Sequence, residues 1–192
     1  LALPRGGVPV AYEVAQALDA PLDVFVVRKL GVPGHEELAM GAIASGGVTV
    51  LNEDVIQGLG IPTETIEAVA AQEQEELLRR ETAYRDHRPA SDPRGRCVIL
   101  IDDGLATGAS MFSAVESIKR QCPSRVVVAV PVAAAPTAER LSRQVDELVV
   151  ARIPSRFYGV GQWYDDFRQT SDEEVRDLLE QAYRDRHAAS GQ

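Results

Sequence analysis

The sequence predicts an α/β fold in which helices flank both faces of a mostly parallel sheet. Four short runs rich in valine, isoleucine and leucine have the length and the β-branched bias of buried strands. These runs span residues 22–28, 97–103, 125–131 and 147–152. Helical patterns stand between or before the runs, and this alternation is typical of βαβ units. Right-handed crossovers between parallel strands then place helices on both faces of the sheet.

The segments between the strands are assigned in chain order. Apolar residues at helical spacing predict helices over residues 9–18, 62–85, 111–121 and 137–145. The second is the clearest, because Glu75 and Glu76 stand four residues before Arg79 and Arg80. A solvated face explains these charges, and contacts between copies in a homo-oligomer are the alternative. Residues 29–50 are rich in glycine and proline, which predicts a mobile loop or a small hairpin.

Composition indicates one globular domain, residues 1–192, with 45% hydrophobic and 26% charged residues. The net charge of −9 argues against binding to nucleic acid or to anionic membranes, since both require an excess of Lys and Arg. The longest apolar stretch, residues 126–135, is too short to cross a bilayer. With no signal peptide visible, we expect a cytoplasmic protein. The chain opens at Leu1 on what resembles a strand end, so we expect upstream residues to be missing.

The cysteines and histidines form no metal or catalytic motif. Cys97 and Cys122 lack CxxC spacing and are expected to be reduced packing thiols. His35, His87 and His187 are scattered along the chain and are expected to be solvated.

The most informative stretch is VILIDDGLATGAS, residues 98–110. A buried strand ends there at Asp102 and Asp103. Ligands of open α/β sheets bind beyond the carboxyl ends of the strands, so both carboxylates are expected to face a ligand. A plain Asp-Gly turn before a capped helix would also explain part of the pattern. Two acids followed at fixed spacing by Thr-Gly and a hydroxyl residue are a more demanding combination.

The loop after the acids is small enough for backbone amides to approach a phosphate closely. It contains Ala106, Thr107, Gly108, Ala109 and Ser110. The helix that follows carries partial positive charge at its start, and the two hydroxyls add donors or an N-cap. The loop is therefore predicted to bind an anion.

This motif resembles the signature of the type I phosphoribosyltransferases, which use 5-phosphoribosyl 1-pyrophosphate (PRPP). The resemblance implies that Asp102 and Asp103 are catalytic and hold the ribose hydroxyls, and that residues 106–110 hold the 5′-phosphate. It also implies the α/β fold of that family with a small variable hood, here contributed by residues 153–167. Mg²⁺ is the implied cofactor, held mainly through PRPP and not by direct protein ligands.

A second small-residue loop contains Arg5, Gly6 and Gly7. Arginine matches phosphate oxygens, and glycines allow close approach of the backbone. A tight turn with Arg5 in water is the alternative. In the resembled family a loop here binds pyrophosphate and can contain a non-proline cis peptide, which we expect near Arg5. Arg28 and Lys29 end another predicted strand, and we assign them to pyrophosphate as well.

Residues 31–43 stand where the resembled family has a flexible loop that closes over the sugar. Ordinary loop polarity explains His35, Glu36 and Glu37 equally well.

Aromatic residues gather in the predicted hood. Phe157, Tyr158, Trp163 and Tyr164 are candidates for stacking on a base, with a cap over the core as the equal alternative. Ala106 stands where purine-salvage relatives often carry an acid, so the motif assigns no general base. Asp165 and Asp166 are the substitutes nearby in sequence.

The function predicted from the sequence is transfer of the phosphoribosyl group of PRPP to a nitrogen nucleophile, a nucleobase, with release of pyrophosphate. This is a pentosyl-transferring glycosyltransferase reaction of nucleotide metabolism. The alternative, favoured by Ala106, is a non-catalytic PRPP or nucleotide sensor that acts on a partner protein. A P-loop phosphotransferase is excluded because no GxxxxGK[ST] motif occurs.

Overall fold

A computed structural model describes residues 1–86 and 88–189. Its central layer is a parallel sheet with strand order β4-β5-β6, formed by β4 (Cys97–Ile101), β5 (Arg125–Val132) and β6 (Glu147–Arg152). Backbone hydrogen bonds extend this layer beyond β4. The Leu3 amide donates to the Ile101 carbonyl at 2.8 Å, and the Phe25 amide donates to Ala2 at 2.8 Å. The predicted buried runs therefore lie side by side, although residues 22–28 contribute only their first part to this layer.

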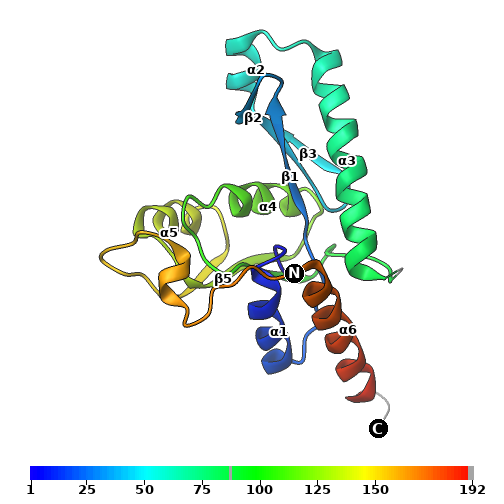
Figure 1. Ribbon diagram of the computed structural model, residues 1–192, viewed down its shortest axis with the longest axis vertical. Coiled ribbons are helices and arrows are strands. Elements are labelled where there is room, and N and C mark those ends of the chain that lie inside the picture. Colours follow the sequence, from blue (N-terminus) through cyan, green and yellow to red (C-terminus); the bar gives the residue numbers. More distant parts are fainter. Residues whose placement is uncertain (87, 190–192) are drawn as a thin grey trace.

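The second sheet is antiparallel, which corrects the expectation of a mostly parallel arrangement. Its order is β1-β2-β3, with β1 (Val27–Val32), β2 (His35–Ala44) and β3 (Val48–Leu51). The chain reverses at Gly34, Gly46 and Gly47, all with positive φ, so residues 29–50 pair with themselves. The predicted hairpin is thus confirmed and gains a third strand. Together with α2 (Glu53–Leu59) and the first half of α3 (Thr63–Arg85), this sheet stands above the parallel sheet in Figure 1.

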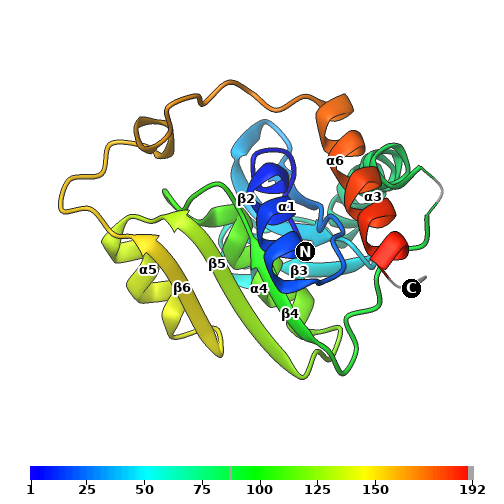
Figure 2. The same cartoon turned by 90° about the horizontal axis from the view of Figure 1, so that it is seen from below.

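Helices cover the parallel sheet unevenly (Figures 1 and 2). The covering helices are α1 (Gly7–Leu18), α4 (Ala109–Lys119) and α5 (Ala135–Ser142), whereas α6 (Asp172–Ala189) packs against α1 and α3. Helices α4 and α5 lie on one face, and α4 also packs against the antiparallel sheet. Helix α1 covers the opposite face only near β4. Val149 of β6 is 48% exposed, so the expectation of helices on both faces holds for β4 and not for the far edge of the sheet.

Several local expectations are corrected. Cys97 and Cys122 are free but exposed. Cys97 is the first residue of β4, and Cys122 lies in a turn with φ of 56°. The prediction that both thiols pack in the core was therefore wrong. Glu76 pairs with both Arg79, at 2.7 Å, and Arg80, at 2.8 Å, in place of two separate pairs.

Two further predictions concern the exposure of the histidines and the lack of a membrane-spanning segment. His35 and His187 are exposed, whereas His87 lies outside the described residues. Among the described helices, none is both long and apolar enough to span a membrane.

Candidate functional site

The two small-residue loops meet at the carboxyl edge of the parallel sheet. Residues 1–3 run parallel to β4, so the loop after Leu3 and the loop after Ile101 leave the sheet at the same edge. Figure 2 shows the segment after β6 passing beyond these strand ends on its way to α6. The topology therefore brings residues nearly a hundred positions apart to one place.

Glycines allow the first loop to pack directly on the acids. A Cβ at Gly6 would lie 2.0 Å from Oδ2 of Asp103, and one at Gly7 would lie 2.9 Å from Cα of Asp102. No side chain fits at either position without displacing an acid or its backbone. The peptide bond between Pro4 and Arg5 is cis, as expected for this loop.

The second loop forms a cavity of about 190 Å³. It is lined by Asp102, residues 104–111 and Val160. The amides of Leu105 and Ala109 donate within the protein, to Val132 O at 2.9 Å and to Thr107 Oγ1 at 3.5 Å. No described residue accepts a hydrogen bond from the amides of residues 106–108. This pattern leaves backbone donors available to an anion in the cavity.

Thr137, at the start of α5, supports this loop from behind. Its hydroxyl donates to the Ala106 carbonyl at 2.5 Å. Gly108 has φ of 73°, and a Cβ there would lie 2.7 Å from Cγ2 of Thr137. The contact thus keeps a carbonyl of the loop turned toward α5.

A larger groove of about 560 Å³ lies on the other side of the acids. Its lining includes Arg5, Gly6, Asp103, Tyr164, Asp166 and Arg168. The Tyr164 hydroxyl donates to the Asp103 carbonyl at 2.6 Å, and its ring lies 5.2 Å from that of Phe167. The two acids therefore separate a cavity with open amides from a groove with cationic side chains.

Burial governs the electrostatics of the acids. It raises the pKa of Asp102 to about 7, helped by the charge of Asp103 and opposed by a 2.9 Å hydrogen bond from the Asp103 amide. Burial also raises the pKa of Asp103. No described lysine or arginine lies within 4.0 Å of either carboxylate. Both carboxylates therefore remain available to hydroxyl donors or to a cation.

The structure does not bring Arg28 and Lys29 into either cavity. Arg28 is half-buried against Glu73 of α3, with Nη2 and Oε2 2.6 Å apart. Lys29 Nζ lies 3.8 Å from Glu37 on the neighbouring strand. Both lie in β1 of the antiparallel sheet, whereas the sequence placed them at the end of a strand of the parallel sheet.

The hood aromatics separate into different environments. Of the four candidates, only Tyr164 lines the groove. Tyr158 is 84% exposed, and Trp163 stacks on Arg152 with 4.7 Å from the guanidinium carbon to the ring centroid. Phe157 is half-buried. The loop candidates His35, Glu36 and Glu37 are exposed in the hairpin, beside Leu59 of α2.

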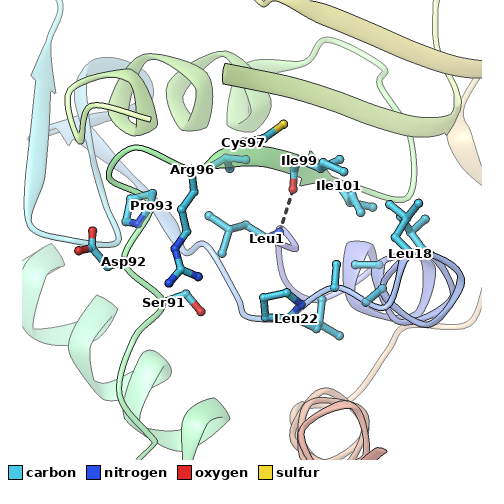
Figure 3. Close-up of a pocket in the computed structure, with 16 residues that line it drawn as sticks. Leu1, Leu18, Leu22, Ser91, Asp92, Pro93, Arg96, Cys97, Ile99 and Ile101 are labelled. Carbon is cyan, nitrogen blue, oxygen red and sulfur yellow. Dashed lines mark hydrogen bonds between the residues drawn. The ribbon is translucent and has the colours of Figure 1, made fainter. Parts of the chain in front are cut away.

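A third cavity lies between α1 and β4, away from the acids (Figure 3). Leu1, Leu18, Leu22, Ile99 and Ile101 contribute aliphatic walls, and Arg96 and Asp92 stand at its polar side. The Leu1 amine donates to the Ile99 carbonyl at 2.8 Å across one side of this space. Its aliphatic lining does not suit a sugar phosphate.

Sequence reasoning missed three residues near the site. Val160 lies over Gly104, where a Cβ would be 2.7 Å from Val160 Cγ1. Asp172 of α6 lies 3.6 Å from Arg5 of the groove lining, and Tyr84 of α3 donates a hydrogen bond to Asp172. The start of α6 had a signal, because Ser171 and Glu174 have the spacing of a capping box, and the Glu174 amide donates to Ser171 Oγ at 3.1 Å.

Comparison with known proteins points to one family. A phosphoribosyl transferase domain model matches residues 33–152. Two curated proteins of Mycobacterium tuberculosis, MT0597 of strain CDC 1551 and Rv0571c of strain H37Rv, carry provisional names as phosphoribosyl transferases. Each is 46% identical over 185 residues, which is 96% of this chain and 42% of theirs. The crystal structure of TT1426 from Thermus thermophilus is similar with a TM-score of 0.82, at 44% identity over 93% of this chain and 84% of that one.

Proposed function

This chain belongs to the phosphoribosyl transferase family, and from that premise we propose that it transfers the phosphoribosyl group of PRPP to a nitrogen nucleophile, a nucleobase. The chain spans 42% of the length of the M. tuberculosis relatives, so the proposal concerns this part of such a protein. The observation that carries it is the position of Asp102 and Asp103 between a cavity with open amides and a groove with Arg5.

The order of these groups matches the order of groups in PRPP. The 5′-phosphate would accept hydrogen bonds from the open amides of residues 106–108. The ribose hydroxyls would donate to Asp102 and Asp103, whose carboxylates have no cationic partner among the described residues. The pyrophosphate would lie on the side of Arg5 and Gly6, in the groove.

The reaction forms a bond from the acceptor nitrogen to C1 of the ribose and breaks the bond from C1 to the pyrophosphate oxygen. Pyrophosphate leaves with the electron pair, and the acceptor nitrogen loses its proton to a base or to solvent. Positive charge develops on the ribose ring in the transition state. Orientation by the two acids, and their negative charge above the raised pKa of Asp102, therefore lower the barrier without covalent catalysis.

The residues present fit Mg²⁺. This ion usually binds through one or two carboxylates and substrate phosphates, and keeps several waters. Asp102 and Asp103 supply adjacent carboxylates beside the place proposed for pyrophosphate. When bound, the ion would neutralise charge on the departing pyrophosphate.

The test is the double variant D102N/D103N, with Asp177→Asn on the exposed side of α6 as the matched control. Calorimetric titration with Mg-PRPP should show binding to the wild type and to the control, and a loss of at least about 100-fold in the double variant, because orientation of the ribose is lost. Unchanged affinity in the double variant would overturn the assignment. Turnover is then assayed with a panel of nucleobases.

A PRPP or nucleotide sensor is the second candidate, since Ala106 leaves the loop without an acid near the reacting nitrogen. The same panel separates the two. Tight binding of Mg-PRPP without pyrophosphate release for any base favours the sensor, whereas release with one base establishes the transferase.

A further inference from the structure

A chain of contacts joins Arg5 to the start of the last helix. Arg5 Nη1 lies 3.6 Å from Oδ1 of Asp172, the first residue of α6. The same oxygen accepts a hydrogen bond from the Tyr84 hydroxyl at 2.8 Å, near the end of α3. Three residues from distant parts of the sequence therefore meet beside the groove.

Tyr84 is the fixed member of this group. It is 2% exposed and belongs to the core cluster that also contains Val175 and Leu179 of α6. Burial and the hydrogen bond to Asp172 raise the pKa of Tyr84 to about 12, so its hydroxyl remains a donor at neutral pH. The donor is held by core packing, and it limits the directions that the Asp172 carboxylate adopts.

The backbone at Asp172 is fixed as well. The Glu174 amide donates to Ser171 Oγ and the Val175 amide donates to Ser171 O, both at 3.1 Å. These bonds cap the first turn of α6. The Asp172 side chain itself is 68% exposed, so its pairing with Arg5 contributes little to stability. Its larger effect is on the direction in which the Arg5 guanidinium points.

Arg5 keeps its hydrogen-bond donors available. No described residue accepts a hydrogen bond from its guanidinium, and the 3.6 Å separation from Asp172 is longer than a hydrogen bond. The groove also contains the carboxylates of Asp103, Asp166 and Glu174. Arg168, the other cation of the lining, lies 3.4 Å from Asp166, whereas Arg5 adjoins Gly6, which contacts Asp103. Without Arg5, a pyrophosphate beside the acids would face mainly negative charge.

We propose that Asp172 and Tyr84 are positioning residues that hold the Arg5 guanidinium at the groove for the pyrophosphate group of PRPP. The inference rests on the proposed function. It makes α6 part of the site, although this helix lies outside residues 33–152, which the family model matches.

The experiment compares Asp172→Asn and Tyr84→Phe with the control Glu173→Gln. Glu173 lies on the same turn of α6 and pairs only loosely with Arg176, at 4.0 Å. Each variant is titrated with Mg-PRPP, inorganic pyrophosphate and ribose 5-phosphate, which lacks the pyrophosphate group. The two test variants should weaken binding of PRPP and pyrophosphate roughly two- to fivefold, as expected for an exposed ion pair, and leave ribose 5-phosphate unchanged. The control should change none of the three.

A double-variant cycle separates positioning from a structural role. In an Arg5→Gln background, Asp172→Asn should have no further effect on PRPP affinity, because its partner is gone. The inference is overturned by an equal loss for ribose 5-phosphate, by an effect that persists without Arg5, or by unchanged pyrophosphate affinity in folded Asp172→Asn. Wild type that binds pyrophosphate but not PRPP overturns only the proposed function, and wild type that binds neither overturns both.

Discussion

The loop before α1 and the loop after β4 lie on either side of the same two acids, and they expose different groups. In the first, the Gly7 amide donates to Leu3 O and the Val8 amide to Arg5 O, both at 3.1 Å, whereas the amides of Arg5 and Gly6 have no acceptor among the described residues. In the second, the amides of residues 106–108 have no acceptor among the described residues. The first loop therefore adds a side-chain cation to its open amides, and the second offers backbone donors without a cation.

This difference shows that small residues serve two purposes at one sheet edge. In the loop after β4, they leave space for an anion beside the backbone. In the loop before α1, Gly6 and Gly7 leave space for the protein itself, since each is in direct contact with an acid or its backbone. Substitutions in the two loops should therefore fail for different reasons.

The largest expected effect is that of Gly6→Ala. The added Cβ would lie 2.0 Å from Oδ2 of Asp103, so the carboxylate must move. A displacement of about 1 Å in a positioning group lowers activity by about 100-fold, and we expect a loss of this size in PRPP turnover with little change in the unfolding free energy. Steady-state kinetics and urea denaturation measure the two quantities.

Gly58→Ala is the matched control for that variant. No atom lies within 4 Å of a Cβ at Gly58, which is inside α2, and alanine favours a helix. Its turnover should equal that of the wild type. Equal turnover in Gly6→Ala would show that the close approach of the first loop to Asp103 has no role in the reaction.

The parts of the site that the sequence predicted are local ones. Asp102, Asp103 and the loop after them lie within a few positions of one another, so strand, acids and small residues form one readable pattern. The contact of Gly6 with Asp103 spans 97 positions, and only the parallel pairing of residues 1–3 with β4 creates it. Asp172 is likewise far in sequence from Arg5, which it contacts only in the folded chain.

Arg28 shows a different limit of sequence reasoning. Its charge and its place at a strand end suggested a ligand contact, yet Glu73 of α3 pairs with it. The two residues are 45 positions apart, and their pairing depends on how α3 crosses the antiparallel sheet. A cation at the end of a strand thus predicts a ligand only when the sheet to which the strand belongs is known.

A smaller effect, on the pH dependence of the unfolding free energy, should distinguish the two acids, because Asp102 lines the cavity and Asp103 lines the groove. The pKa of Asp102 is raised from 3.8 to about 7, so the folded protein holds this proton more tightly than the unfolded chain does. Its contribution to stability is complete below about pH 4 and is lost as pH rises toward about 7. We expect up to about 2 kcal/mol, after allowance for partial exposure of the carboxyl.

Urea denaturation across this pH range checks the sign. The unfolding free energy of the wild type minus that of Asp102→Asn should fall as pH rises, because the variant lacks the titrating group. The same difference taken with Asp103→Asn should fall less. A difference for Asp102→Asn that rises with pH would mean that the Asp102 pKa is lowered by folding.

The smallest effect is expected from Thr137→Val, which acts on the second loop alone. The change keeps the shape of the side chain and removes the donor to the Ala106 carbonyl, a hydrogen bond of 2.5 Å. Loss of one such bond lowers the unfolding free energy by about 1 kcal/mol, and we expect a weakening of ribose 5-phosphate binding by about threefold as the loop loses its support. Calorimetry should show unchanged affinity for inorganic pyrophosphate, because Arg5 and its loop do not touch Thr137. Thr137→Ser keeps the donor and should bind both ligands as the wild type does. If Thr137→Val weakened pyrophosphate binding as much as ribose 5-phosphate binding, the two loops would not be independent, and the division between backbone donors and a side-chain cation would have to be abandoned.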